Sequence, residues 1–146
     1  MEVKHSVISI TPYPIDFCQI LADMMDKSSG GTTLFMGSVR DHNEDHKVSQ
    51  IFYEAYKEMA EETLHEIETE LRKRWNITKF IVVHRIGLLR AGDISIAIAV
   101  SSEHRKGAFE ACNYCIEEIK KRVPIWKKEV SEFGEAWVEG ISLKGD

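Results

Sequence analysis

The segment that most constrains the fold is ISIAIAVSS, residues 94–102. Large branched side chains alternate there with alanine and serine, so Ile94, Ile96, Ile98 and Val100 share one face and small residues share the other. Strict alternation is the period of a β-strand. A face made only of small side chains suits close contact with a helix. The segment therefore predicts a strand within a sheet that a helix covers.

The other periodic segments set the order of elements around this strand. Alternating segments predict strands at 4–10, 32–40, 49–56, 79–87, 126–130 and 135–140, and three-four spacing predicts helices at 15–26, 57–75 and 107–123. Gly37 inside a strand indicates a bulge, Asn76 a helix C-cap, and Pro124 the end of the third helix. Residues 41–47 and 88–93 are expected to form a loop and a turn. Because strands come in pairs between helices, we expect an α+β fold.

Length and charge exclude several classes of protein. With 146 residues and no repeat or linker, residues 1–146 are expected to form a single domain. The net charge of −5 argues against a general nucleic-acid binder, and no run approaches the roughly 20 apolar residues of a membrane span. The N-terminus lacks the pattern of a secretory signal. Three cysteines are too few for a disulfide framework, which predicts a cytoplasmic protein.

Positive charge is concentrated in KKRVPIWKKE, residues 120–129, although the chain as a whole is acidic. The helix dipole favours cations at the end of a helix, which accounts for part of this cluster. It does not account for Lys127 and Lys128, which follow the proline. Alternation places Lys128 with Trp126 on one face of the strand and Lys127 on the other, where Lys127 can approach Lys120. Amines held close together suit anion binding or amine chemistry.

Two further segments offer groups that bind anions. His104, Arg105 and Lys106 precede a predicted helix start, where free backbone N–H groups and the dipole attract negative charge. His104 could also carry a proton. Arg40 ends a strand and presents a planar fork for phosphate or carboxylate. An ordinary polar loop and a solvated strand end are the alternatives for these segments.

Two patterns imitate functional sites. His42 and His46, with the acidic residues around them, resemble metal ligands, but a third well-placed ligand is missing, so no metal or cofactor is expected. Cys112 and Cys115 have redox-motif spacing but lie beside the predicted apolar helix face. We interpret both as buried hydrophobic side chains. With Cys18 inside the first amphipathic helix, the chain offers no obvious sulfur nucleophile.

The segments GSVRDHN, RIGLLRAGD, SSEHRKGAFEAC and IKKRVPIWKKE resemble the catalytic subunits of molybdopterin synthase over roughly residues 30–140. The resemblance implies an α/β-hammerhead-like fold, with an antiparallel or mixed sheet packed by helices and a small additional β-subdomain. It implies a sulfurtransferase of molybdenum cofactor biosynthesis that converts precursor Z, a cyclic pyranopterin monophosphate, into the molybdopterin dithiolene. The sulfur would come from a small ubiquitin-like subunit whose C-terminal Gly-Gly ends in a thiocarboxylate. A homodimer would bind two small subunits, giving a heterotetramer.

The same resemblance assigns roles to residues. Lys120 and Lys127 match the catalytic lysines of the family. The expected substrate-binding set comprises Ser38, Val39, Arg40, His104, Arg105, Lys128 and Glu129. His104 and Arg105 would reach the pocket from the other protomer. The missing cysteine nucleophile fits this assignment, because sulfur would arrive on the partner.

Some features depart from the family, and other functions stay open. A glycine is expected in the turn at residues 43–47, and a small residue is expected in place of Glu103. One alternative is a non-catalytic module that binds anions or RNA, although Trp126 is the only aromatic residue in the basic cluster. Another is a subunit that only captures a carboxylate-ended peptide tail.

Overall fold

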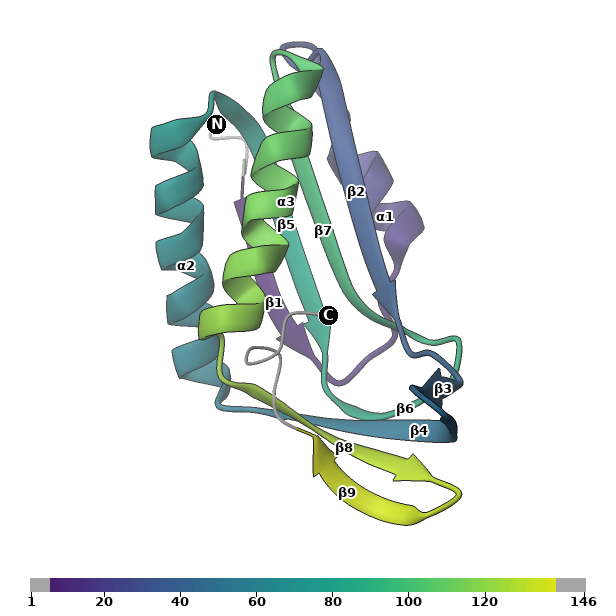
Figure 1. The fold of residues 1–146 in the computed structure, drawn as a ribbon. Coiled ribbons are helices and arrows are strands. Elements are labelled where there is room, and N and C mark those ends of the chain that lie inside the picture. The colour runs from purple at the N-terminus through teal and green to yellow at the C-terminus, as the bar shows by residue number, and fades with distance from the viewer. Residues whose placement is uncertain (1–5, 139–146) are drawn as a thin grey trace.

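A computed structural model describes residues 6–138. Their strands form a four-stranded and a five-stranded sheet, and helices pack against the four-stranded one (Figure 1). The strands are β1 (Ser6–Thr11), β2 (Gly31–Ser38), β3 (His42–Asn43), β4 (His46–Ala55), β5 (Ile77–Arg85), β6 (Gly87–Arg90), β7 (Ile94–Ser102), β8 (Ile125–Ser131) and β9 (Gly134–Val138). The helices are α1 (Phe17–Asp23), α2 (Lys57–Arg74) and α3 (Arg105–Arg122). No helix between residues 6 and 138 is long and apolar enough to cross a membrane. The outer parts of the predicted strands at 4–10 and 135–140 lie outside the described residues.

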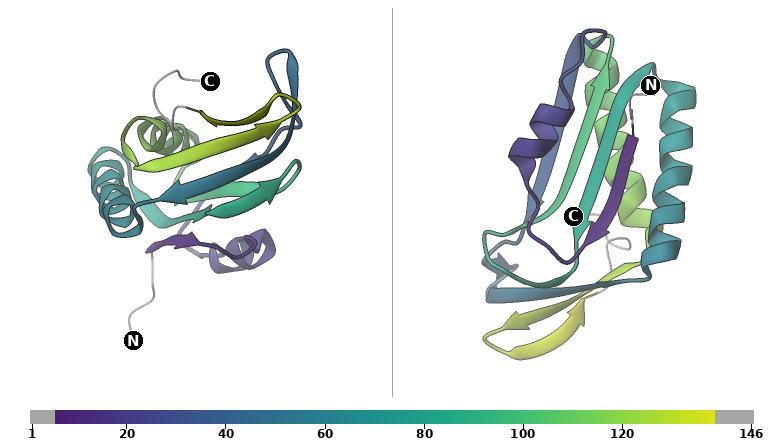
Figure 2. Two further views of the ribbon diagram at one scale, coloured as in Figure 1. Left: turned by 90° about the horizontal axis from the view of Figure 1, so that it is seen from below. Right: turned by 180° about the vertical axis from the view of Figure 1, so that it is seen from behind.

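The four-stranded sheet has the order β1-β5-β7-β2 and is mixed, because β1 runs parallel to β5 while the other pairs are antiparallel. Strand β7 is buried on both faces. Ile98 belongs to the main core with α2 and α3, whereas Ala97 and Ala99 pack with Ile20 of α1 and with Met24, the C-cap of that helix. Figure 2 shows α1 on one side of the sheet and the two long helices on the other. The predicted helix over the small-residue face is confirmed.

The five-stranded sheet is antiparallel and joins segments far apart in the sequence. Its order is β3-β4-β8-β9, and β6 also pairs with β4. It forms the small β-subdomain at the lower end of the molecule in Figure 1. The predicted turn at 88–93 and loop at 41–47 were wrong in part, because short strands β6 and β3 occupy these segments. Strands of two to four residues are too short to show an alternating pattern, and pairing with β4 is what orders them.

The helices follow the predicted apolar stripes with local exceptions. The stripe of α2 is fully buried and consists of Ala60, Leu64, Ile67 and Leu71. The C-cap of α2 is Trp75 rather than Asn76, and α3 begins at Arg105 rather than near Gly107. Phe109 has the helical spacing of the buried residues of α3 but is 63% exposed. The helix α3 packs on β7 and β2, and β2 is the edge strand of its sheet.

An ion-pair network joins the two long helices. Arg122 donates to both carboxylate oxygens of Glu70, at 2.8 and 2.9 Å, and the Tyr114 hydroxyl donates to Glu70 at 2.6 Å. The hydrogen bonds from Arg122, followed by the one from Tyr114, lower the pKa of Glu70 from 4.5 to about 2. The network therefore stabilises the fold above pH 4.5, and this contribution is lost as the pH falls toward 2.

Replacing Glu70 by glutamine is expected to lower the free energy of unfolding by about 1 kcal/mol at pH 7, a value kept small because the side chain is partly exposed. The difference from the wild type should shrink as the pH falls from 5 toward 2. Urea unfolding at several pH values measures it. Glu66→Gln is the matched control, because Glu66 is 69% exposed and approaches Arg122 no closer than 3.6 Å, which is too far for a hydrogen bond. A Glu70→Gln effect that does not change with pH would contradict the network's charge as the cause.

Candidate functional site

The strand β2 and the helix α3 begin together at one end of the molecule. The backbone of Gly31 lies so close to the helix start that an added Cβ would stand 3.0 Å from the Cα of Arg105. From there β2 extends about 23 Å to Ser38, and α3 extends about 22 Å to Lys120. Because α3 packs along β2 and β7, Lys120 and Ser38 lie at the same end of the molecule, near the five-stranded sheet (Figure 1).

The orientation of α3 directs Lys120 away from α2. The opposite flank of the helix carries Tyr114 and Arg122, which bind Glu70 of α2. Lys120 follows the fully buried Ile119 and is half-buried on the other flank. This flank lies on the side of α3 away from α2, and β2 is the edge strand of the sheet on which α3 packs.

Arg40 lies just beyond the end of β2, on a backbone held by its neighbours. The strand register shifts between Gly37 and Ser38, which confirms the predicted bulge. Val39 is buried, its N–H donates to the carbonyl of Asp93 at 2.9 Å, and its own carbonyl accepts from Gly92 at 2.8 Å. The side chain of Arg40 is exposed on this fixed base. A cation is therefore presented at the same end of β2 as Lys120.

Lys127 lies on the inner face of β8, as alternation predicts. Its partner across the ladder is Tyr53, which is buried, and Lys127 itself is half-buried. Lys128 has the opposite orientation. Its ammonium group pairs with Glu135 at 2.8 Å and lies 5.6 Å from the ring of Trp137. Only Lys127 of these two lysines shares a face with the buried side chains that adjoin α3.

Glu129 also lies on the inner face of β8 and is 7% exposed. One carboxylate oxygen accepts from the amide of Asn43 at 2.8 Å, and the other lies 2.5 Å from Nε2 of His46. Both oxygens are thus occupied by the hairpin formed by β3 and β4. Sequence reasoning assigned no role to Asn43 and considered His46 only as a metal ligand.

His104 and Arg105 lie at the far end of α3. The helix separates Arg105 from Lys120 by about 22 Å within one chain. His104 is the N-cap residue, its side chain is 85% exposed, and its ring lies 3.8 Å from Glu103. One chain therefore brings Lys120, Lys127, Ser38, Val39 and Arg40 to one end and leaves the His104–Arg105 pair at the other.

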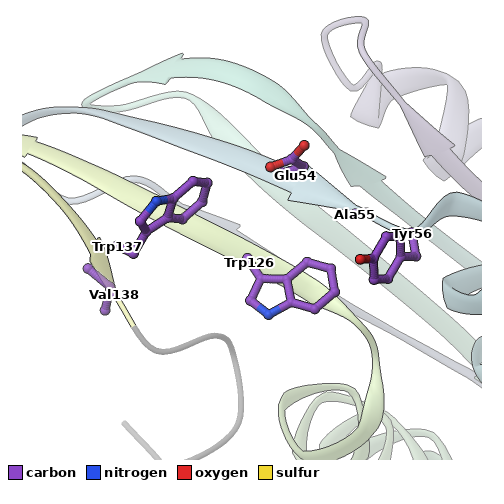
Figure 3. A pocket seen from close by; sticks show the side chains of 6 residues that line it. All are labelled: Glu54, Ala55, Tyr56, Trp126, Trp137 and Val138. Atoms are coloured by element: carbon purple, nitrogen blue, oxygen red, sulfur yellow. The ribbon is translucent and has the colours of Figure 1, made fainter.

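An open pocket of about 470 Å³ lies on the outer face of the five-stranded sheet. Figure 3 shows its lining, which consists of Glu54, Ala55, Tyr56, Trp126, Trp137 and Val138. The rings of Tyr56 and Trp126 meet edge to face at 4.9 Å. Among residues 6–138 this lining contains a carboxylate and no lysine or arginine, so these residues do not suit a phosphate. The pocket is on the opposite face of β8 from Lys127.

The cysteines of α3 are not suited to act as nucleophiles. Cys112 and Cys115 are buried, and burial raises the pKa of both thiols, that of Cys112 to about 11. Their interpretation as core side chains is confirmed. Cys18 is exposed on α1, across the sheet from α3. Residues 6–138 contain no group of three or more side chains arranged to hold a metal, and His46 contacts Glu129 instead.

Comparisons with known proteins agree with this architecture. A family model described as "MoaE protein" matches residues 10–122. A molybdopterin synthase catalytic subunit from Pyrococcus abyssi is 43% identical over 92% of this chain and 93% of its own length. The human molybdopterin synthase catalytic subunit is 37% identical over 93% of this chain and 72% of its own length.

Solved structures share the fold over nearly the whole chain. Molybdopterin synthase from Staphylococcus aureus superposes with a TM-score of 0.81 at 40% identity, covering 94% of this chain and 98% of that one. The MoaE protein of Burkholderia ambifaria gives a TM-score of 0.82 at 31% identity, covering 96% and 93%. A complex of subunits 1 and 2 of the molybdopterin-converting factor from Helicobacter pylori, at 21% identity and a TM-score of 0.75, shares the fold.

Proposed function

Because the chain belongs to the MoaE protein family, we propose that it is the catalytic subunit of a molybdopterin synthase, an enzyme of molybdenum cofactor biosynthesis. The proposal includes the substrate, precursor Z, and the transfer of sulfur that makes its dithiolene. Curated relatives named as this subunit match most of the chain at 37–43% identity. The observation that carries the proposal is that Lys120, Lys127 and Arg40 all belong to the end of the molecule at which the five-stranded sheet lies.

The chemistry needs cations more than it needs a nucleophile of the chain's own. We propose that sulfur arrives on a small ubiquitin-like partner as a C-terminal thiocarboxylate. Its sulfur bonds to a substrate carbon as the bond from that carbon to oxygen breaks, and the oxygen leaves with a proton. Water then adds to the acyl carbon, the acyl–sulfur bond breaks, and the partner leaves with a carboxylate. Lys120 would take the proton from that water, or its amine would first capture the acyl carbon. Arg40 and Lys127 would hold the phosphate of the substrate and the anionic terminus of the partner.

A second copy of the chain completes this site in our proposal. About 22 Å of helix separate Arg105 from Lys120, so the His104–Arg105 pair cannot serve the lysines of its own chain. We propose a homodimer in which each protomer supplies this pair to the other, and a heterotetramer with two small subunits. The three cysteines are free, which suits the reducing cytoplasm that we propose as its compartment.

Reconstitution tests the proposed function directly. The purified chain is mixed with a thiocarboxylated small subunit and precursor Z, and the dithiolene product is measured. We expect product to form, and to be absent when the small subunit ends in an ordinary carboxylate. Tight binding of the small subunit without any conversion would instead favour a subunit that only captures the peptide tail. Binding of generic RNA that persists above about 0.2 M salt would favour the nucleic-acid alternative.

A further inference from the structure

The contact between the β3–β4 hairpin and β8 has a role that the proposed function does not assign. We propose that Glu129 is a positioning residue, which together with His46 and Asn43 fastens the hairpin that follows Arg40 to the strand that carries Lys127. We name these three side chains the hairpin clamp. The inference rests on the proposed function only for its effect on catalysis, because the contact itself can be tested without any activity.

The hairpin is short and depends on contacts outside itself. It pairs His42 with Lys47 and Asn43 with His46, and Glu44 in its turn has a positive φ of 54°. A two-residue strand contributes little pairing of its own. The N–H of Val48 donates to the carbonyl of Asp41 at 2.8 Å, which closes the base of the hairpin next to Arg40. Any movement of the hairpin therefore reaches Arg40 through one peptide unit.

The clamp supplies outside contacts made by side chains, in addition to the longer contacts between Lys47 and Glu132 at 3.4 and 3.5 Å. Asn43 and His46 each bind one oxygen of Glu129, from 86 and 83 residues away in the sequence. A carboxylate that is 7% exposed is costly to bury unless it is paired, so removal of either partner leaves an unsatisfied charge. Within β8, Glu129 is two residues from Lys127 and therefore on the same face. The contact thus connects the base of Arg40 to the strand position of Lys127.

Arg40 is consequently held from two directions. On one side Val39 is fixed by Asp93 and Gly92 in the turn between β6 and β7. On the other side the hairpin is fixed by the clamp. A shift of about 1 Å in catalytic groups can cost 10²-fold in rate, so the clamp matters even though its side chains need not touch the substrate.

The charges around the clamp make it dependent on pH. The groups that face His46 are Glu129, Asp45 at 3.8 Å and Glu132, with the Phe133 ring at 5.7 Å. The hydrogen bond to Glu129 is the main cause that raises the pKa of His46 above 6.5.

The pKa of Glu129, the second group of the pair, is shifted in the opposite direction. Burial alone would raise the pKa of Glu129, but hydrogen bonds from His46 and Asn43 and the charge of Lys127 lower it below 4.5. At a pH between the lowered pKa of Glu129 and the raised pKa of His46, both side chains are charged. The clamp is therefore strong at pH 6.5, and it weakens as the pH rises through the raised pKa of His46.

The first test measures the contact alone. Histidine C–H resonances are followed by NMR from pH 5 to pH 9 in the wild type and in Glu129→Gln, which keeps the shape of the side chain without its charge. We expect His46 to titrate above 6.5 in the wild type and closer to 6.5 in the variant. An unchanged titration of His46 would overturn the clamp, whether or not the protein transfers sulfur.

The second test measures the effect on catalysis. In the reconstituted enzyme, His46→Gln keeps a hydrogen-bond donor but cannot be charged, and we expect kcat/KM at pH 6.5 to fall about 10-fold, a change of about 1.4 kcal/mol. The decline in wild-type kcat/KM with rising pH that follows His46 should be absent from this variant. His42→Ala is the matched control, because His42 lies in the same hairpin and its ring hydrogen-bonds to its neighbour Asp41 rather than to Glu129. We expect it to keep the wild-type profile.

The outcomes separate the two proposals. Identical pH profiles for the wild type and His46→Gln, with both proteins folded and active, would overturn the positioning role. Absence of sulfur transfer in the wild type would overturn the proposed function, while the NMR titration would still decide whether the clamp exists. Thermal unfolding of each variant shows whether a loss of activity reflects a loss of fold.

Discussion

Replacing Lys120 by alanine is expected to lower kcat for sulfur transfer by about 10²- to 10⁴-fold, the range typical of a lost general acid or base. Lys120 is half-buried at the end of α3, on the flank away from α2, where we propose that the partner terminus and the substrate meet. Single-turnover measurements with the thiocarboxylated small subunit give the rate. The effect should appear in kcat more than in the affinity for the partner.

Two companion variants make this prediction specific. Lys121→Ala removes the neighbouring lysine, which is 63% exposed and pairs with Glu118 at 3.6 Å, and it should change kcat less than twofold. Lys120→Arg keeps the positive charge but cannot give up a proton near neutrality. If Lys120→Arg recovered most of the activity, the lysine would act as an anion-binding charge, and its proposed part in proton transfer or acyl capture would be wrong.

Replacing Lys127 by alanine is expected to lower kcat/KM by about 10- to 100-fold, corresponding to the loss of a charged hydrogen bond to substrate or partner. The reason is its location on the inner face of β8, opposite Tyr53 and near the end of α3. Steady-state kinetics that vary precursor Z and the small subunit separately show which ligand it holds. We expect the larger part of the effect in KM.

The same strand offers an internal comparison. Lys128 was expected to bind substrate, yet it lies on the outer face of β8 and pairs with Glu135. We expect Lys128→Ala to cost less than Lys127→Ala under the same conditions. A larger loss for Lys128→Ala would mean that the substrate uses the outer face, where the aromatic pocket lies.

Features that depend on neighbouring residues could be predicted from the sequence. Alternation along residues 126–129 predicted the opposite faces of Lys127 and Lys128, and glycine inside a strand predicted the bulge at Gly37. The two-faced composition of residues 94–102 predicted a covering helix on the small-residue side. In each case the signal lies within a few residues of the feature.

Features that depend on distant pairing could not be predicted. The hairpin at residues 41–47 consists of polar side chains typical of an exposed loop, and it is ordered by the pairing of β3 with β4 and by side-chain contacts to β8. The two partners of Glu129 are more than 80 residues away, and no local pattern identifies either of them. Phe109 has the spacing of a core residue, but the sheet ends at β2 and leaves it exposed.

The span of α3 also has a genetic consequence. If each catalytic centre takes Lys120 from one chain and His104 from the other, a chain with Lys120→Ala and a chain with His104→Ala carry complementary defects. Co-expression should give mixed dimers, in which one centre lacks both groups and the other lacks neither. With random assembly, half of the dimers are mixed and about a quarter of wild-type turnover should return. Two alleles that each give an inactive enzyme alone would then restore cofactor synthesis when they are expressed together.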